Sequence, residues 1–194
     1  MGLLRAFIAV EIPSTIQDAI HESTAGLHKT LGEGLIRWVP PHNVHLTLKF
    51  LGDVSPASLD LIKHMLSAEV TQHACFEMRV EGIGTFPNSR RPRVIWVGLQ
   101  APAVLESFQR SIDSASARLG YASDGKNFSP HLTIGRVKQD PSALEVQRIR
   151  AALEETKIGN LGVVHVEAVH LFKSDLQPSG SVYTRLFSAP IGKN

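Results

Sequence analysis

The sequence is poor in cysteine and contains no long hydrophobic run. Cys75 is the only cysteine among 194 residues, which excludes an intrachain disulfide bond and a cysteine-rich zinc site. Its apolar neighbourhood, Ala74-Cys75-Phe76, is typical of a buried structural thiol. No run approaches the roughly 18 apolar residues of a membrane-spanning helix. The first residues lack the basic segment of a signal peptide, and Glu11 interrupts their apolar run. We therefore expect a cytoplasmic protein that binds no membrane.

The sequence also lacks an excess of charge of either sign. It has 20 Lys and Arg residues against 18 Asp and Glu residues, a formal net charge of +2. With 43% hydrophobic and 20% charged residues, the composition is that of a globular protein and excludes disordered and fibrous classes. A protein that coats nucleic acid needs a dense basic face, so that mode of binding is excluded. Recognition of a single phosphate in a cleft remains compatible with this balance.

Segments with helical and strand patterns alternate along the chain. The expected helices cover residues 14–31, 55–72, 102–119 and 142–156. The expected strands cover residues 3–12, 36–39, 44–51, 74–85, 94–99, 128–136, 163–172 and 181–187. A similar order recurs in both halves, and no Gly/Ser-rich or Pro-rich linker divides them. We therefore expect a single α/β (α+β) domain over residues 1–194, duplicated in layout, whose halves share one sheet system.

Two similar tetrapeptides are the sharpest sign of this duplication. HLTL occupies residues 45–48 and HLTI occupies residues 131–134, close to half the chain apart. Side chains alternate between the faces of a strand, so His and Thr of each motif share a face opposite the apolar residues. The same alternation predicts that Lys49 lies beside His45 and Thr47, and that Phe50 points the other way into the core.

Paired histidines and hydroxyls meet the needs of phosphodiester hydrolysis. One group must activate water and another must protonate the leaving oxygen. Imidazole titrates near neutrality, so His45 and His131 can share this work. Thr47 and Thr133 can donate hydrogen bonds to phosphate oxygens as their charge grows. The scheme needs no metal ion, and no third ligand stands at zinc spacing, so we expect neither a metal nor a cofactor.

Arginines near the motifs are further candidates for phosphate binding. Arg136 follows the second motif, and a guanidinium can hold two phosphate oxygens at once. Strict alternation places Arg136 opposite His131, unless Gly135 permits a bulge or the strand ends there. The loop over residues 86–93 joins an aromatic ring to three arginines, Arg90, Arg91 and Arg93. This loop either binds RNA by stacking and charge or is a solvated connection between strands.

Together, these motifs resemble those of the two-histidine (2H) phosphoesterase superfamily. The chain is similar to its RNA 2′,3′-cyclic phosphodiesterases, also called 2′-5′ RNA ligases, over essentially its whole length. The similar segments are RAFIAVEIP, VPPHNVHLTLKFLGDV, GIGTFPNSRRPRVIWVGL, FSPHLTIGR and LFKSDLQPSGSVYTRL. The resemblance implies a bilobal fold with pseudo-two-fold symmetry. In that fold, antiparallel sheets line a central cleft and the helices lie outside.

The resemblance also implies an activity, which is hydrolysis of a terminal 2′,3′-cyclic phosphate on RNA, such as a tRNA half, to leave a 2′-phosphate. It implies that His45 protonates the departing 3′ oxygen and that His131 activates water. It assigns phosphate oxygens to Thr47 and Thr133, and Arg136 matches the arginine that follows the family's second motif. Gly135 stands where alanine is common, and Ile134 stands where leucine is common.

Three other activities are open at this point. The same site could perform 2′-5′ RNA ligation, with a ribose 5′-hydroxyl in place of water, or hydrolyse a small cyclic nucleotide. The third is non-catalytic binding of RNA ends, although both motifs are intact. Nothing in the sequence suggests an obligate protein partner, so we expect a monomer.

Overall fold

The structure is a computed structural model that describes residues 2–123, 125, 127–178 and 180–192. Its strands form one nine-stranded sheet in the order β7-β4-β5-β6-β3-β1-β8-β9, with β2 paired to β6, and all these pairings are antiparallel. The strands are β1 (Leu4–Glu11), β2 (Ile36–Trp38), β3 (His45–Val54), β4 (Phe76–Phe86), β5 (Val94–Gln100), β6 (His131–Val137), β7 (Val163–Val166), β8 (Ala168–Gln177) and β9 (Gly180–Pro190). The helices are α1 (Ser14–Leu31), α2 (Leu59–Val70), α3 (Ala103–Arg118) and α4 (Ala143–Glu155), with short 3₁₀ helices η1 (Pro41–Asn43) and η2 (Pro56–Ser58). The predicted α/β class and shared sheet are confirmed.

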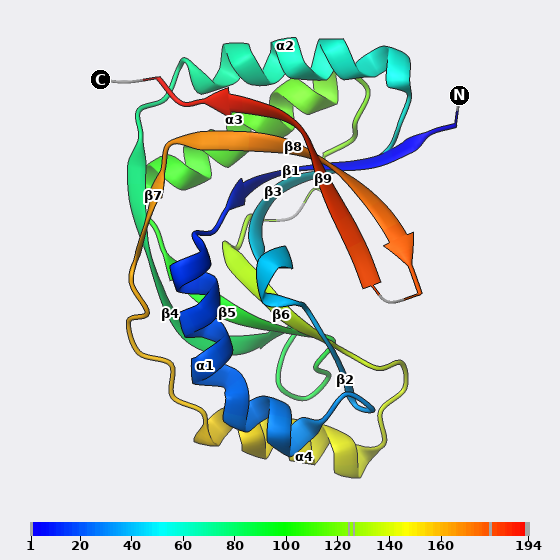
Figure 1. Ribbon diagram of the computed structural model, residues 1–194, viewed down its shortest axis with the longest axis vertical. Coiled ribbons are helices and arrows are strands. Elements are labelled where there is room, and N and C mark those ends of the chain that lie inside the picture. Colours follow the sequence, from blue (N-terminus) through cyan, green and yellow to red (C-terminus); the bar gives the residue numbers. More distant parts are fainter. Residues whose placement is uncertain (1, 124, 126, 179, 193–194) are drawn as a thin grey trace.

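The sheet divides into two lobes where β3 meets β6. These strands pair only through Leu46 and Leu132. The first lobe holds β1, β3, β8 and β9 beneath α2 and α3, and the second holds β2, β4, β5, β6 and β7 with α1 and α4 (Figure 1). We call the side of each half-sheet that its helices leave uncovered the open face.

The lobes are not the two halves of the sequence. The chain leaves β1 in the first lobe to form α1, which packs on α4 in the second lobe. It leaves β5 in the second lobe to form α3, which packs on α2 and β3 in the first lobe. Each lobe is therefore built from both halves of the chain, an exchange that periodicity along the sequence could not reveal.

Local sequence signals explain most element boundaries. In α1, buried side chains recur every three or four residues, at Ile16, Ile20, Thr24, Leu27 and Leu31. α4 begins with a capping box, in which Ser142 and Glu145 each accept a hydrogen bond from the other's backbone N–H. No helix of the described residues is long and apolar enough to cross a membrane.

Two expectations about the strands and loops were wrong. The strand expected over residues 163–172 is interrupted at Glu167, because β7 pairs with β4 in the second lobe and β8 pairs with β1 and β9 in the first. The apolar pattern is alike on both sides of that change of partner, so it shows no break. Cys75 is exposed rather than buried, because it lies in the surface connection between α2 and β4.

Candidate active site

The junction between the lobes brings the two HLT motifs together. Leu46 and Leu132 are directly paired, and both are buried. In an antiparallel pair, this register places His45 across from Thr133, and Thr47 across from His131. Their side chains point away from the buried leucines and are all partly accessible. The predicted site residues therefore meet on the open face, around the point where the lobes join.

Each histidine is held by the same local hydrogen bond. His45 Nδ1 lies 2.7 Å from the carbonyl oxygen of Asn43, and His131 Nδ1 lies 2.7 Å from that of Ser129. A carbonyl oxygen only accepts, so Nδ1 carries the hydrogen in both rings. Nε2 is then the atom that remains to take or give a proton. Both rings are thus oriented with the same nitrogen available for chemistry.

Both histidines have pKa values below that of free imidazole. Burial lowers the pKa of His45 most, the bond to Asn43 opposes this, and the charges of Arg136 and His131 lower it further. Burial also lowers the pKa of His131, against the bond to Ser129, and Arg136 adds to the lowering. At neutral pH the free site therefore favours neutral imidazoles. An anionic ligand between the rings would raise both pKa values.

A β-bulge follows the threonine in each motif. In β3, Ile8 pairs with Lys49 and Ala9 pairs with Thr47, which leaves Leu48 as the extra residue. In β6, the corresponding extra residue is Ile134, between the pairs Ile95–Gly135 and Trp96–Thr133. A bulge reverses the faces of all residues beyond it. Strict alternation therefore fails at the same place in both motif strands.

The bulge at Ile134 changes the face on which Arg136 lies, which strict alternation had placed opposite His131. It turns this side chain onto the open face with His131 and Thr133, where its charge acts on both histidines. The bulge that Gly135 was expected to permit is present directly before it, and Gly135 has a second role. A Cβ there would lie 2.7 Å from Ile36 Cγ2 and 3.0 Å from the Trp38 ring, so glycine lets β2 pack closely on β6.

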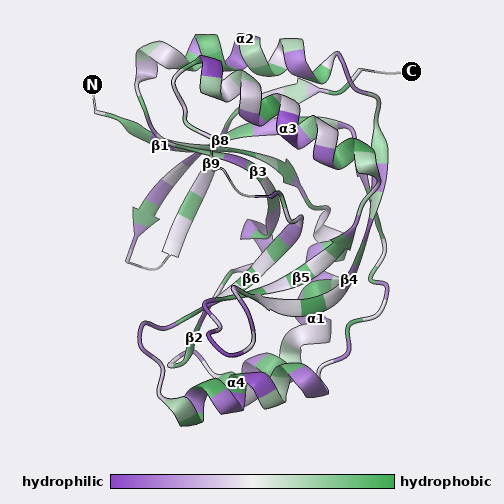
Figure 2. Cartoon of the chain, turned by 180° about the vertical axis from the view of Figure 1, so that it is seen from behind, coloured by the Kyte–Doolittle hydropathy of each residue, from purple (hydrophilic) through white to green (hydrophobic). Residues whose placement is uncertain are grey.

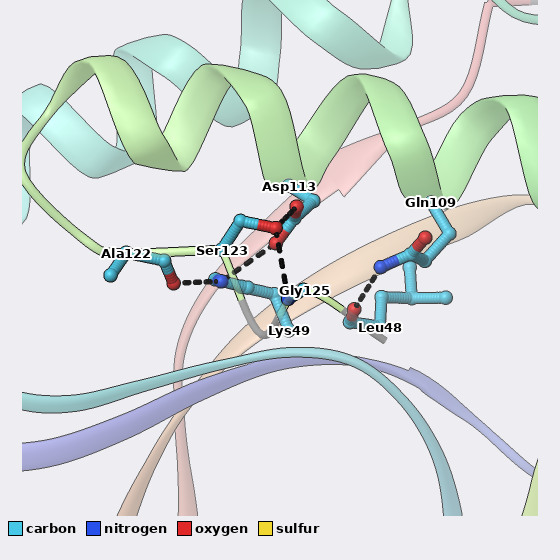
Figure 3. A network of polar contacts seen from close by, with 7 residues as sticks. All are labelled: Leu48, Lys49, Gln109, Asp113, Ala122, Ser123 and Gly125. Carbon is cyan, nitrogen blue, oxygen red and sulfur yellow. Dashed lines mark hydrogen bonds and ion pairs between the residues drawn. The ribbon is translucent and has the colours of Figure 1, made fainter. Parts of the chain in front are cut away.

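The bulge at Leu48 overturns two expectations in β3. Lys49 does not lie beside His45 but is buried on the opposite face, with 1% of its side chain exposed. Its Nζ donates hydrogen bonds to Asp113 Oδ1 at 2.6 Å and to the carbonyl of Ala122 (Figure 3). Phe50 correspondingly points away from the core and is 55% exposed.

Helix α3 holds this bulge in place. Gln109 Nε2 donates to the carbonyl of Leu48, the extra residue, at 3.2 Å (Figure 3). One turn further, Asp113 accepts from Lys49 and also from Ser123 Oγ at 2.5 Å. The bulge is therefore tied to α3 by a backbone contact and an ion pair, and its geometry is determined by long-range partners.

Aromatic rings surround both histidines. The Phe7 ring lies 4.8 Å from that of His45, and the Tyr183 ring meets His45 edge-on at 5.3 Å. On the other side, Phe86 meets His131 edge-on at 4.8 Å. Phe7 is buried as expected for a core residue, but it belongs to a small cluster with Ala9 and Phe172, separate from the main core.

The loop arginines lie on an exposed turn. Asn88 Oδ1 accepts the backbone N–H groups of Arg90 and Arg91, at 3.0 and 3.1 Å, which shapes the turn. Figure 2 shows this connection as a hydrophilic loop below β6. Arg93 approaches Asp140 at 3.9 Å. The three side chains are exposed.

Strand pairing adds residues that the sequence could not connect to the motifs. Arg37 in β2 pairs directly with Arg136, and Glu11 in β1 pairs directly with His45. Asn43 and Ser129 act through backbone carbonyls, which no side-chain motif reveals. Among the described residues, no three His, Cys, Asp or Glu side chains gather as metal ligands.

A cavity of about 570 Å³ adjoins His45, between strands of the first lobe and the start of α1. Its apolar wall includes the rings of Phe7, Phe172 and Tyr183, and its polar lining includes Glu11 and Ser14. The remaining lining residues are Ile12, Pro13, Gln17, His42, Asn43 and Val44. This volume falls within the range typical of small-ligand sites.

Comparison with known proteins also shows two similar halves in this chain. The family described as LigT like Phosphoesterase matches residues 10–96 and again residues 97–183. The RNA 2′,3′-cyclic phosphodiesterase of Methanothermobacter thermautotrophicus is 32% identical over 181 residues, 93% of this chain and 95% of the relative. The crystal structure of a Thermus thermophilus protein has a TM-score of 0.79 and 27% identity, with 97% of this chain and 98% of that chain covered. Escherichia coli LigT complexed with 3′-AMP has a TM-score of 0.75 and 25% identity over the same shares.

Proposed function

This chain belongs to the LigT like phosphoesterase family of the 2H superfamily, and from that premise we propose that it hydrolyses terminal 2′,3′-cyclic phosphates of RNA to 2′-phosphates. The observation that carries the proposal is the junction of the two motifs. It brings two equally oriented histidines and two threonines onto one face. The Methanothermobacter relative is named RNA 2′,3′-cyclic phosphodiesterase, and E. coli LigT is complexed with 3′-AMP, a ribonucleotide with phosphate on its 3′ oxygen.

The proposed reaction is an in-line displacement at phosphorus. His131 Nε2 takes a proton from water as the new oxygen–phosphorus bond forms. His45 Nε2 gives a proton to the 3′ oxygen as its bond to phosphorus breaks. The phosphate remains on the 2′ oxygen, and no metal ion takes part. Both pKa values are lowered in the free site, which suits His131 as a base, and a bound phosphate anion raises both. The acid role of His45 is assigned from the resemblance to the family.

The remaining polar groups are proposed to stabilise charge on the phosphate. Thr47 and Thr133 lie across from the opposite histidines and donate hydrogen bonds to the non-bridging oxygens. Arg136 reaches the same place from beyond its bulge and supplies the positive charge. Arg90, Arg91 and Arg93 contact the RNA further from its end, where they are exposed.

We also propose that one chain acts alone as a single bilobal domain over residues 1–194. Both histidines come from the same chain, and a continuous sheet joins the lobes. The balanced charge and single cysteine support cytoplasmic RNA ends, tRNA halves among them, as the substrates.

The direct test uses a defined oligonucleotide that ends in a 2′,3′-cyclic phosphate. The enzyme is expected to convert it to a 2′-phosphate product, identified by chromatography against both isomers, and EDTA is expected to leave the rate unchanged. Absence of hydrolysis, a 3′-phosphate product or loss of activity in EDTA would each contradict the proposal.

Removal of either histidine tests the assigned roles. His45→Ala and His131→Ala are each expected to lower kcat by at least about 10²–10⁴-fold, whereas His64→Ala, at an exposed histidine of α2, is the matched control. A nitrophenyl phosphodiester, whose leaving group needs no proton, should restore the His45 variant and not the His131 variant. The reverse pattern would exchange the acid and the base.

A further inference from the structure

The cavity beside His45 is large enough for more than a phosphate, and its position relative to the proposed acid indicates what enters it. In the proposed reaction, the 3′ oxygen leaves next to His45. The ribose that carries this oxygen also carries the nucleobase, so both must lie on the His45 side of the phosphorus. The first lobe is therefore where the terminal nucleoside needs a surface, and the cavity adjoins His45 there.

The wall of this cavity has the chemistry of a base-stacking site. Phe7 and Phe172 stack on each other, with ring centroids 5.3 Å apart, and both are buried. Tyr183 stands edge-on to Phe7 at 5.0 Å and to His45 at 5.3 Å, and it remains partly exposed. Tyr183 is therefore the ring of this cluster that offers accessible surface to a ligand.

Two hydrogen bonds of Asn43 link the strand of Tyr183 to His45. Asn43 Nδ2 donates to the carbonyl of Ser181 at 2.8 Å, which ties β9 to the segment before β3. The carbonyl of the same Asn43 accepts from His45 Nδ1. One residue thus connects the orientation of the histidine with the strand that carries the tyrosine.

The charges of the cavity disfavour phosphate as the occupant. Glu11 lines it, and its Oε2 accepts from Arg185 Nη1 at 2.8 Å, so the cation of this lobe face is already paired. His170 Nε2 lies 3.5 Å from the same carboxylate oxygen. By contrast, Arg136 belongs to the second lobe. An uncharged nucleoside suits the cavity better than an anionic group does.

We propose that this cavity binds the terminal nucleoside of the cyclic-phosphate end, with its base stacked on Tyr183. The site rests on the proposed function and adds a base-dependent selectivity to it. It predicts that the enzyme prefers a nucleotide over the same cyclic phosphate without a base, and that this preference depends on Tyr183.

The test compares adenosine 2′,3′-cyclic phosphate with methyl riboside 2,3-cyclic phosphate, which has the same reacting atoms and no base. The wild-type enzyme should prefer the nucleotide in kcat/KM by roughly 5- to 150-fold, the contribution of one stacked base. Tyr183→Ala should lose most of this preference, because its kcat/KM falls for the nucleotide and not for the base-free substrate. Tyr183→Phe should retain the preference. Leu61→Ala, which removes an exposed apolar side chain of α2 outside the cavity, is the control and should leave the ratio unchanged.

A second variant fills the cavity and leaves the aromatic cluster intact. Ser14 is exposed at the start of α1 and lines the cavity. Ser14→Trp should raise KM for the nucleotide and leave KM for the base-free substrate unchanged. If circular dichroism shows that Tyr183→Ala is unfolded, the Ser14→Trp comparison alone tests the nucleoside site. Equal effects on both substrates, or loss of the preference in Leu61→Ala, would overturn the nucleoside site. Absence of hydrolysis with either substrate would instead count against the proposed function.

Discussion

The two motif strands, β3 and β6, have the same backbone geometry and differ in the side chains that follow the bulge. In both, a histidine is bonded to the carbonyl two residues before it, a threonine follows, and a bulge comes next. Beyond the bulge, the first lobe presents Phe50 and the second presents Arg136 at the corresponding position. The duplication thus preserves the geometry proposed for proton transfer, while the residues beyond it set different surroundings on the two sides.

The buried positions after the bulges also differ. Lys49 fills its position with a long charged side chain paired to Asp113, whereas Gly135 leaves its position to Ile36 and Trp38. One bulge is held by a polar contact with α3 and the other by close packing against β2. The same backbone irregularity is therefore stabilised in two chemically different ways, which mutations can separate.

The largest expected effect comes from breaking the polar support in the first lobe. Asp113→Ala leaves the ammonium of Lys49 buried without its carboxylate, at a cost of about 3–5 kcal/mol in the free energy of unfolding. In the second lobe, Gly135→Ala should cost only about 1–3 kcal/mol, through overpacking. Urea denaturation measures both. The double variant Lys49→Met/Asp113→Leu should recover most of the loss, and an Asp113→Ala variant as stable as wild type would contradict the interpretation.

An intermediate effect comes from the positions after the bulges that face the site. In the wild type, the lowered pKa values of His45 and His131 place both limbs of the kcat/KM profile below pH 6.5. Arg136→Met removes a charge that opposes protonation of both rings, so their pKa values rise and the profile moves to higher pH. We also expect kcat/KM to fall roughly tenfold to a hundredfold, because the variant cannot make a charge-assisted hydrogen bond to the phosphate.

Phe50→Met provides the matched comparison in the first lobe. It removes no charge, so the pH profile should stay in place. A profile that moves equally in both variants, or in neither, would show that the charge of Arg136 does not set the pKa values of the histidines.

The smallest effect is expected from the exposed arginines of the second lobe. Arg90→Ala/Arg91→Ala should raise KM severalfold for a long RNA and lower the salt dependence of binding, by about one unit of slope for each phosphate that these side chains neutralise. A mononucleotide cyclic phosphate should show no change. Arg5→Ala, at an exposed arginine of β1 in the first lobe, is the control; equal losses in both would mean that the RNA has no preferred lobe.

Much of this molecule could be predicted from local patterns. Periodicity located the helices and most strands, and the repeated HLT motif identified the polar face around His45 and His131. Alternation failed at Leu48 and Ile134, because a bulge depends on its partner strand and, for Leu48, on the amide of Gln109 far along the chain. Strict alternation placed Arg136 on the face opposite His131, but the possible bulge at Gly135 and the family resemblance both kept Arg136 as a candidate.

The contacts that could not be predicted from the sequence depend on how the strands pair in three dimensions. No pattern in the sequence joins Arg37 to Arg136 or Glu11 to His45, since each pair comes from strands whose adjacency is a property of the whole sheet. The carbonyls of Asn43 and Ser129 are backbone groups, and every residue has one. Their selection as partners of the histidines follows from the turn before each strand.

The exchange of α1 and α3 between the lobes has a consequence for cooperativity. We expect the two lobes to unfold together, because each contains elements from both halves of the chain and the sheet runs through both. Partial unfolding that removed one histidine would also disturb the helices that support the other. His45 and His131, the proposed acid and base, are therefore expected to lose their positions together.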